Sequence, residues 1–101
     1  MPDKAVYFHP EALREAEAAV AWYRERSPLA AASFLVEIER AVQAVSESPG
    51  RWPVFETATR RYPLHRFPYW VIYREREKAI EVLAVAHARR RPGYWRIRKG
   101  K

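Results

Sequence analysis

The 101-residue chain contains no cysteine and only three glycines and one methionine. Without cysteine it forms no disulfide and offers no thiolate to a metal, and a reducing compartment fits this composition. Its three histidines are scattered without metal-ligand spacing, so no metal site is expected. The sequence has neither a glycine-rich phosphate loop nor a Ser-His-Asp arrangement. We therefore expect a protein that works without a metal or cofactor.

Long apolar runs are also missing. No run approaches the roughly 18 residues needed to span a bilayer, and the N-terminus lacks the basic-then-apolar pattern of a secretory signal. We expect a cytoplasmic protein without membrane contact. The length predicts one domain over residues 1–101, and the hydrophobic content of 49% predicts a folded chain with a modest core.

Acidic residues are scarce in the second half of the chain. Residues 1–50 carry five Lys/Arg and eight Asp/Glu, a net charge of −3, whereas residues 51–101 carry fourteen and four, a net charge of +10. Solubility alone can explain a charged surface. Segregation of this size within one small domain favours a face that binds a polyanion or an acidic partner protein.

The first half predicts a strand followed by two helices. β-Branched and aromatic residues predict a strand over residues 5–8, and His9-Pro10-Glu11 is typical of a helix start. Ser27-Pro28 predicts a second start, and Ser48-Pro49-Gly50 predicts the end of that helix. Because few residues separate the helices, they should form an antiparallel hairpin.

Apolar residues recur at helical spacing in both helices. The predicted stripes consist of Leu13, Ala16, Val20 and Tyr23, and of Phe34, Leu35, Ile38, Val42 and Val45. The large apolar side chains that exceed what one small sheet face obviously buries are Val20, Trp22, Tyr23, Phe34 and Leu35. These five are either plain core or part of a groove for a partner helix. The pairs Glu11/Glu15 and Glu37/Glu39 are expected on solvated helix faces.

The second half predicts three strands. Residues 59–66 form the first, and Pro63 indicates an irregular or edge strand because it lacks a backbone donor. Residues 69–74 form the second, and a charged turn leads to residues 80–86, which are nearly all apolar, as expected of a central strand. The predicted fold is α+β with the order β-α-α-β-β-β, a small and mostly antiparallel sheet packed against the helical hairpin.

Cations and aromatics cluster after the last predicted strand, where His87 is followed by Arg89-Arg90-Arg91, a Pro-Gly break and Tyr94-Trp95. Guanidinium groups bind phosphate bidentately, and histidine titrates near neutral pH, so the materials for metal-free RNA cleavage are present in kind. Each residue also has a structural interpretation. Arg66 can pair with a glutamate, His87 can be a hydrogen-bonded structural imidazole, and the two aromatics can cover the open end of the core.

The segments Leu64–Tyr73 (LHRFPYWVIY) and Val82–Trp95 (VLAVAHARRRPGYW), together with the element order and length, resemble the RelE/ParE superfamily. Its members are toxins of bacterial type II toxin–antitoxin modules, often labelled plasmid stabilisation proteins. The resemblance covers essentially the whole chain and is greater to the ParE branch. It implies a growth-arresting toxin held inactive in a hetero-oligomer with a cognate antitoxin, whose C-terminal segment lays a helix in a groove of the toxin, here at Val20, Trp22, Tyr23, Phe34 and Leu35.

The resemblance implies two possible targets. ParE-like members inhibit DNA gyrase by binding, and RelE-like members cut mRNA in the ribosomal A site. Arg66, Arg90 and Tyr94 fall at or near functional positions of the ribonuclease branch, but Ala88 stands where a functional arginine would align, and that branch's lysines have no counterpart. A binding-only gyrase inhibitor is therefore favoured.

The favoured target or nucleic-acid contacts are Arg66, Arg89, Arg90, Arg91, Tyr94 and Trp95. The first alternative is a ribosome-dependent mRNA endonuclease whose catalytic residues are Arg66, His87, Arg90 and Tyr94. The second alternative is a small basic nucleic-acid-binding domain without toxic activity.

Overall fold

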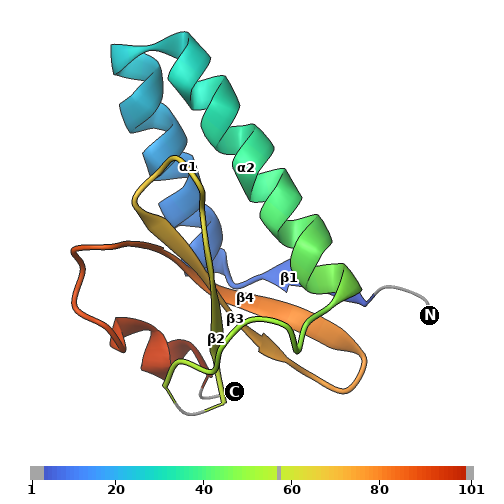
Figure 1. Ribbon diagram of the computed structural model, residues 1–101. Coiled ribbons are helices and arrows are strands. Elements are labelled where there is room, and N and C mark those ends of the chain that lie inside the picture. Colours follow the sequence, from blue (N-terminus) through green and yellow to red (C-terminus); the bar gives the residue numbers. More distant parts are fainter. Residues whose placement is uncertain (1–3, 57, 100–101) are drawn as a thin grey trace.

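A computed structural model describes residues 4–56 and 58–99 of the chain (Figure 1). The elements are β1 (Ala5–Phe8), α1 (Pro10–Arg26), α2 (Pro28–Glu47), β2 (Arg60–Pro63), β3 (Tyr69–Glu75), β4 (Ala79–His87) and a 3-10 helix, η1 (Tyr94–Lys99). The predicted α+β class and element order are confirmed, whereas η1 was not foreseen. Within the described ranges, no helix is both long and apolar enough to cross a bilayer.

Each helix begins where the sequence predicts. The Nδ1 atom of His9 accepts a hydrogen bond from the Glu11 backbone N–H at 3.0 Å and caps α1. The Ser27 hydroxyl accepts from the Ala30 backbone N–H at 3.1 Å and caps α2, while the Ser27 N–H donates to the Tyr23 carbonyl at 2.7 Å. Ser27 thus ends one helix and begins the next, which keeps the hairpin connection tight.

The sheet has the order β1-β4-β3-β2. β1 pairs with β4 in parallel, and the other two pairings are antiparallel, so the prediction of a mostly antiparallel sheet with a central last strand is confirmed. Pro63 lies at the end of edge strand β2, where its missing donor costs nothing. The predicted strand over residues 59–66 is too long. The chain turns after Pro63 because the Glu37 carboxylate accepts hydrogen bonds from the backbone N–H groups of His65 and Arg66.

The two faces of the sheet are covered by different parts of the chain (Figure 1). The helical hairpin covers the face that carries Val71 and Val85. The segment containing η1 covers the opposite face, where Trp95 packs with Ile72, Leu83 and partners on β4. The sheet therefore has a helical face and a second face covered by the C-terminal segment, and the two faces present different residues to partners.

Two residues of the predicted apolar stripes point outward. Leu13 is 48% exposed and Leu35 is 44% exposed, although both were expected on the buried face of their helices. The residues of α1 that enter the core are mainly alanines, which let the hairpin approach the sheet closely. The larger side chains of Leu13 and Leu35 therefore remain at the surface.

Tyr73 gives a pH-dependent prediction. It is fully buried, its hydroxyl donates to the Pro49 carbonyl at 2.6 Å, and burial raises its pKa to about 12. The unfolded chain ionises this group near pH 10, so its stabilisation is complete below pH 10 and is lost as the pH rises toward 12. We expect Tyr73→Phe to lower the free energy of unfolding by about 1 kcal/mol at neutral pH and to make its alkaline decline less steep. Urea unfolding across this pH range measures both effects.

The matched control is Tyr7→Phe. This substitution removes the same hydroxyl group from a side chain that is 64% exposed. It should change neither the neutral stability nor the alkaline decline. An equal decline in wild type and Tyr73→Phe would contradict the prediction.

Candidate functional site

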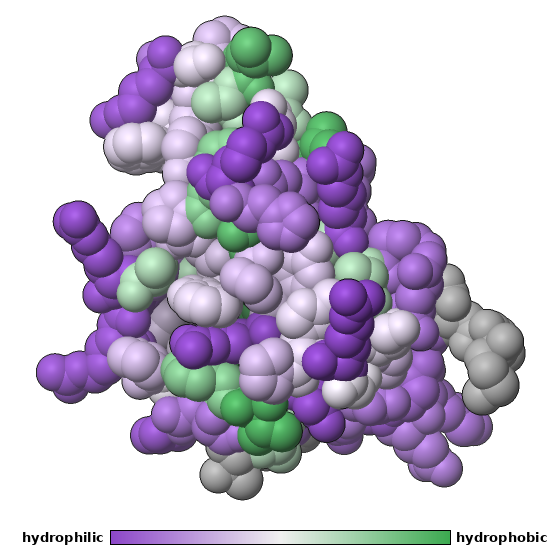
Figure 2. Space-filling view, viewed as in Figure 1, coloured by the Kyte–Doolittle hydropathy of each residue, from purple (hydrophilic) through white to green (hydrophobic). Residues whose placement is uncertain are grey.

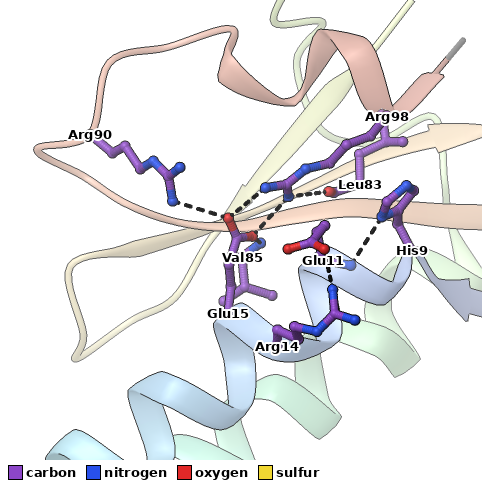
Figure 3. Close-up of polar contacts among 8 residues, drawn as sticks. All are labelled: His9, Glu11, Arg14, Glu15, Leu83, Val85, Arg90 and Arg98. Carbon is purple, nitrogen blue, oxygen red and sulfur yellow. Dashed lines mark hydrogen bonds and ion pairs between the residues drawn. The ribbon is translucent and has the colours of Figure 1, made fainter.

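Glu15 of α1 is the centre of a polar cluster at the edge of β4 (Figure 3). One carboxylate oxygen accepts from the Val85 backbone N–H at 2.9 Å and from Arg98 Nη1 at 3.1 Å. The other accepts from Arg98 Nη2 at 3.0 Å and Arg90 Nη1 at 3.2 Å. The Glu15 side chain is only 14% exposed. The expectation of a solvated helix face for Glu15 is therefore wrong.

The cluster exists because β1 is short. β1 ends at Phe8, whose partner in β4 is Val82, so the β4 backbone beyond this point has no neighbouring strand on that side. Glu15 accepts the N–H of Val85, and Arg98 donates to the carbonyl of Leu83 at 2.8 Å. Two side chains thus provide the hydrogen bonds that a longer strand would otherwise supply.

The charges in the cluster do not cancel. Burial acts to lower the pKa of Arg98, but its hydrogen bond to Glu15 and the charge of that carboxylate outweigh this, and the pKa of Arg98 is raised. Arg98 is 10% exposed and neutralises Glu15 by a two-nitrogen contact. Arg90 is 52% exposed and adds a further positive charge. The cluster therefore presents a net positive charge at the surface, carried by Arg90.

Tyr94 and Trp95 are largely withdrawn from solvent. The Arg90 guanidinium lies over the Tyr94 ring, with Cζ 3.5 Å from the ring centroid. The Tyr94 hydroxyl is buried, and burial, with a further contribution from the Glu15 carboxylate, raises the pKa of Tyr94. Trp95 is only 2% exposed and belongs to the core of the second face. Trp95 therefore has little surface with which to contact a target directly.

His87 ends β4 and organises the following turn. Its Nδ1 atom accepts a hydrogen bond from the Arg89 backbone N–H at 3.1 Å, and its ring packs edge-on against Tyr69. Because Nδ1 acts as an acceptor, the neutral imidazole carries its proton on Nε2. In this geometry the Nδ1 atom is engaged by the backbone of the following turn, as in a structural imidazole.

Arg66 lies in the connection between β2 and β3, where Glu37 holds it. Glu37 accepts from the backbone N–H groups of His65 and Arg66, at 2.6 and 3.2 Å, and from Arg66 Nε at 3.3 Å. Glu37 is 6% exposed, so its predicted position on a solvated helix face is wrong. The Arg66 side chain is 70% exposed and available to a partner.

The predicted site residues line two separate hollows. A hollow of about 550 Å³ between α1 and the end of β4 is lined by Glu15, Ala18, Ala19, Trp22, Tyr23, Pro68, Tyr69, Val85, His87 and Arg90. It brings His87 and Arg90 together beside Trp22. Arg66 instead lines another hollow, with Leu29 and Phe67, at the start of α2. The predicted catalytic residues are therefore not gathered around one space.

A third hollow is an apolar groove along the outer side of the hairpin. It measures about 450 Å³ and is lined by Phe8, Leu13, Ala16, Glu17, Val20, Arg24, Leu35 and Ile38. Of the predicted antitoxin contacts, Val20 and Leu35 lie here, Trp22 and Tyr23 line the hollow at the end of β4, and Phe34 is fully buried. Figure 2 also shows hydrophobic side chains at the free end of the hairpin and a second hydrophobic group at the bottom of the view, among mainly hydrophilic residues.

A family model described as "ParE toxin of type II toxin-antitoxin system, parDE" matches residues 6–92 of the chain. The chain belongs to this family. Among solved structures, one described as "Chromosomal ParDE TA system from P. aeruginosa" is similar, with a TM-score of 0.73 at 18% identity over 83% of this chain and 95% of that chain. A search of curated proteins finds no match. The ParE family membership confirms the resemblance drawn from the sequence and makes the chain a type II toxin.

In this ParE toxin the arginine run divides into two kinds of residue. Arg90 pairs with Glu15, whereas Arg89 and Arg91 are exposed and form no ion pair with any residue in the ranges 4–56 and 58–99. The same part of the toxin contains no group of three metal-ligating side chains. Arg89 and Arg91 are thus free cations beside the Arg90 cluster.

The sequence did not predict that two glutamates of the ParE-family toxin form part of the site. Glu15 and Glu37 have the helical spacing of surface residues, and no local signal separates them from Glu11 or Glu39. The sequence contained only an indirect signal that such polar partners were needed. A four-residue first strand beside a much longer last strand predicts an unpaired edge, and an unpaired edge needs polar partners.

Proposed function

We propose that this ParE-family toxin inhibits DNA gyrase by binding, without chemistry of its own, in the cytoplasm. The observation that supports the proposal is that the candidate catalytic groups are held by structural contacts or lie apart from one another. His87 Nδ1 accepts a backbone hydrogen bond, the Tyr94 hydroxyl is buried and the pKa of Tyr94 is raised, and Arg66 lines a different hollow. Free Arg89 and Arg91 support a role for the basic turn in binding the gyrase–DNA target.

We further propose that a cognate antitoxin silences the toxin by placing an apolar helix face in the groove between α1 and α2. The groove exposes Leu13 and Leu35, and its lining is mainly apolar, as a helix-binding groove requires. The basic second half of the toxin is complementary to an acidic antitoxin segment. Trp22 and Tyr23 at the end of β4 provide a second apolar contact for the same chain.

Pulse-labelling of DNA and protein synthesis after induction of the toxin alone tests the gyrase proposal. We expect DNA synthesis to stop first, because a gyrase inhibitor blocks replication before translation. His87→Ala and Tyr94→Phe should remain toxic, since removal of a true general acid or base lowers a rate by about 10²–10⁴. Circular dichroism establishes that both variants fold.

The opposite result has a defined meaning. If protein synthesis stops first and folded His87→Ala loses toxicity, the binding-only proposal is wrong and ribonuclease action replaces it. If the folded toxin arrests neither process, the toxin does not act on gyrase in the cell used.

A further inference from the structure

The second face of the sheet carries an arginine with an unusual environment. Arg61 of β2 lies opposite Ile72 of β3 and therefore on the face away from the helical hairpin. Its guanidinium carbon is 4.1 Å from the ring centroid of Phe55 and 4.0 Å from that of Trp70. Two aromatic rings thus hold one cation in place.

The contacts of Arg61 leave its hydrogen-bonding capacity unused. Ring contacts occupy the flat faces of a guanidinium, whereas its five N–H donors leave from the edge. Within residues 4–56 and 58–99, the Arg61 side chain forms neither a hydrogen bond nor an ion pair. By contrast, Arg60 beside it donates to the Trp52 carbonyl at 2.7 Å. Arg61 is therefore a positioned cation with donors free for an external acceptor.

The surroundings of Arg61 are positively charged. A hollow of about 40 Å³ beside it is also lined by Trp70, His87 and Arg90, and no acidic residue of the described chain lines it. Nearby Glu56, next to Phe55 in sequence, is held by Arg96 at 2.6 Å. The turn that bears Arg89 and Arg91 forms one wall, through Ala88 and Pro92. The local field therefore favours an anion.

We propose that the Arg61 hollow binds a phosphate group of a nucleic-acid backbone. The hollow is small, at about 40 Å³, which suits phosphate oxygens better than a base. Arg61 and Arg90 line the hollow, and the turn that forms one wall bears Arg89 and Arg91, which matches the repeated charges of a polyanion better than a single carboxylate. Binding through the backbone predicts little sequence preference and strong salt dependence. This inference does not depend on gyrase as the target.

Fluorescence anisotropy of the full-length toxin with a short labelled DNA duplex tests the site. We expect Arg61→Gln to weaken binding about tenfold and to reduce the slope of log K against log salt concentration by about one. The matched control is Arg60→Gln, which removes the same charge from the neighbouring residue and should change affinity about twofold or less. Polyglutamate of similar length is the competing probe.

Three outcomes would overturn the proposal: equal losses in the Arg60 and Arg61 variants, no loss in either, or a larger Arg61 effect on polyglutamate than on DNA. The last outcome would assign the hollow to an acidic protein segment. Thermal unfolding of each variant establishes its fold. If Arg61→Gln does not fold, Arg61→Lys carries the test, because lysine keeps the charge but lacks the guanidinium edge, and weaker DNA binding is again expected.

Discussion

Replacement of Glu15 by alanine is expected to lower the free energy of unfolding by about 3–5 kcal/mol, because it leaves Arg98 buried with no carboxylate partner. The same change removes the acceptor of the Val85 backbone N–H at the β4 edge. A small domain is typically stable by only about 5–15 kcal/mol, so the variant should lose most of its margin. Urea unfolding followed by circular dichroism measures the loss.

The matched control is Glu17→Ala, on the same helix. Glu17 is exposed and forms no hydrogen bond or ion pair with the part of the chain that the structure describes, so its replacement should cost less than about 0.5 kcal/mol. A double-mutant cycle with Arg98→Met isolates the ion pair, and we expect a coupling energy of about 1–3 kcal/mol. Similar losses in Glu15→Ala and Glu17→Ala would show that the cluster contributes little.

Leu35→Glu is expected to weaken binding of the cognate antitoxin by at least about a hundredfold, which corresponds to about 2.7 kcal/mol. Leu35 lines the groove between α1 and α2 and is 44% exposed, so glutamate fits the free toxin. In the complex, the apolar face of the antitoxin helix would cover the new carboxylate without a partner, and desolvation would oppose binding. Calorimetric titration measures the affinity, and antitoxin should no longer rescue growth.

Leu29→Glu is the control for this prediction, since Leu29 is 77% exposed and lies outside the groove at the start of α2. It introduces the same charge into the same helix and should bind antitoxin with nearly unchanged affinity. Unchanged binding by Leu35→Glu would place the antitoxin elsewhere, and the hollow that contains Trp22 would then be the next surface to test.

The fold was predictable because its main signals are local. Pro10 and Glu11 mark the start of α1, and Ser27 caps α2 as predicted, because these signals act within three residues along the chain. Pro63 indicates an edge strand because of one missing N–H group. The nearly all-apolar sequence of β4 indicates burial on both faces, and the strand lies in the centre of the sheet.

The site was less predictable because its contacts join distant parts of the chain. Glu15 pairs with Arg98, and Glu37 pairs with Arg66, yet periodicity assigns both glutamates to solvated helix faces. Which way Leu35 points depends on the packing of the hairpin, which spacing alone does not give. Arg61 received no role from the sequence, since its free donors and its aromatic neighbours Phe55 and Trp70 become visible only in three dimensions.

The Glu15–Arg98 pair also bears on how the protein matures during synthesis. Ribosomes add about 5–20 residues per second, and Arg98 becomes available only after the helices and strands that precede it have been made. A nascent or prematurely terminated chain that lacks Arg98 retains the Glu15 carboxylate without its principal counterion and the Leu83 carbonyl without its donor. A chain that stops before Arg98 is therefore expected to fold less stably than one that contains it and to be a better substrate for proteases.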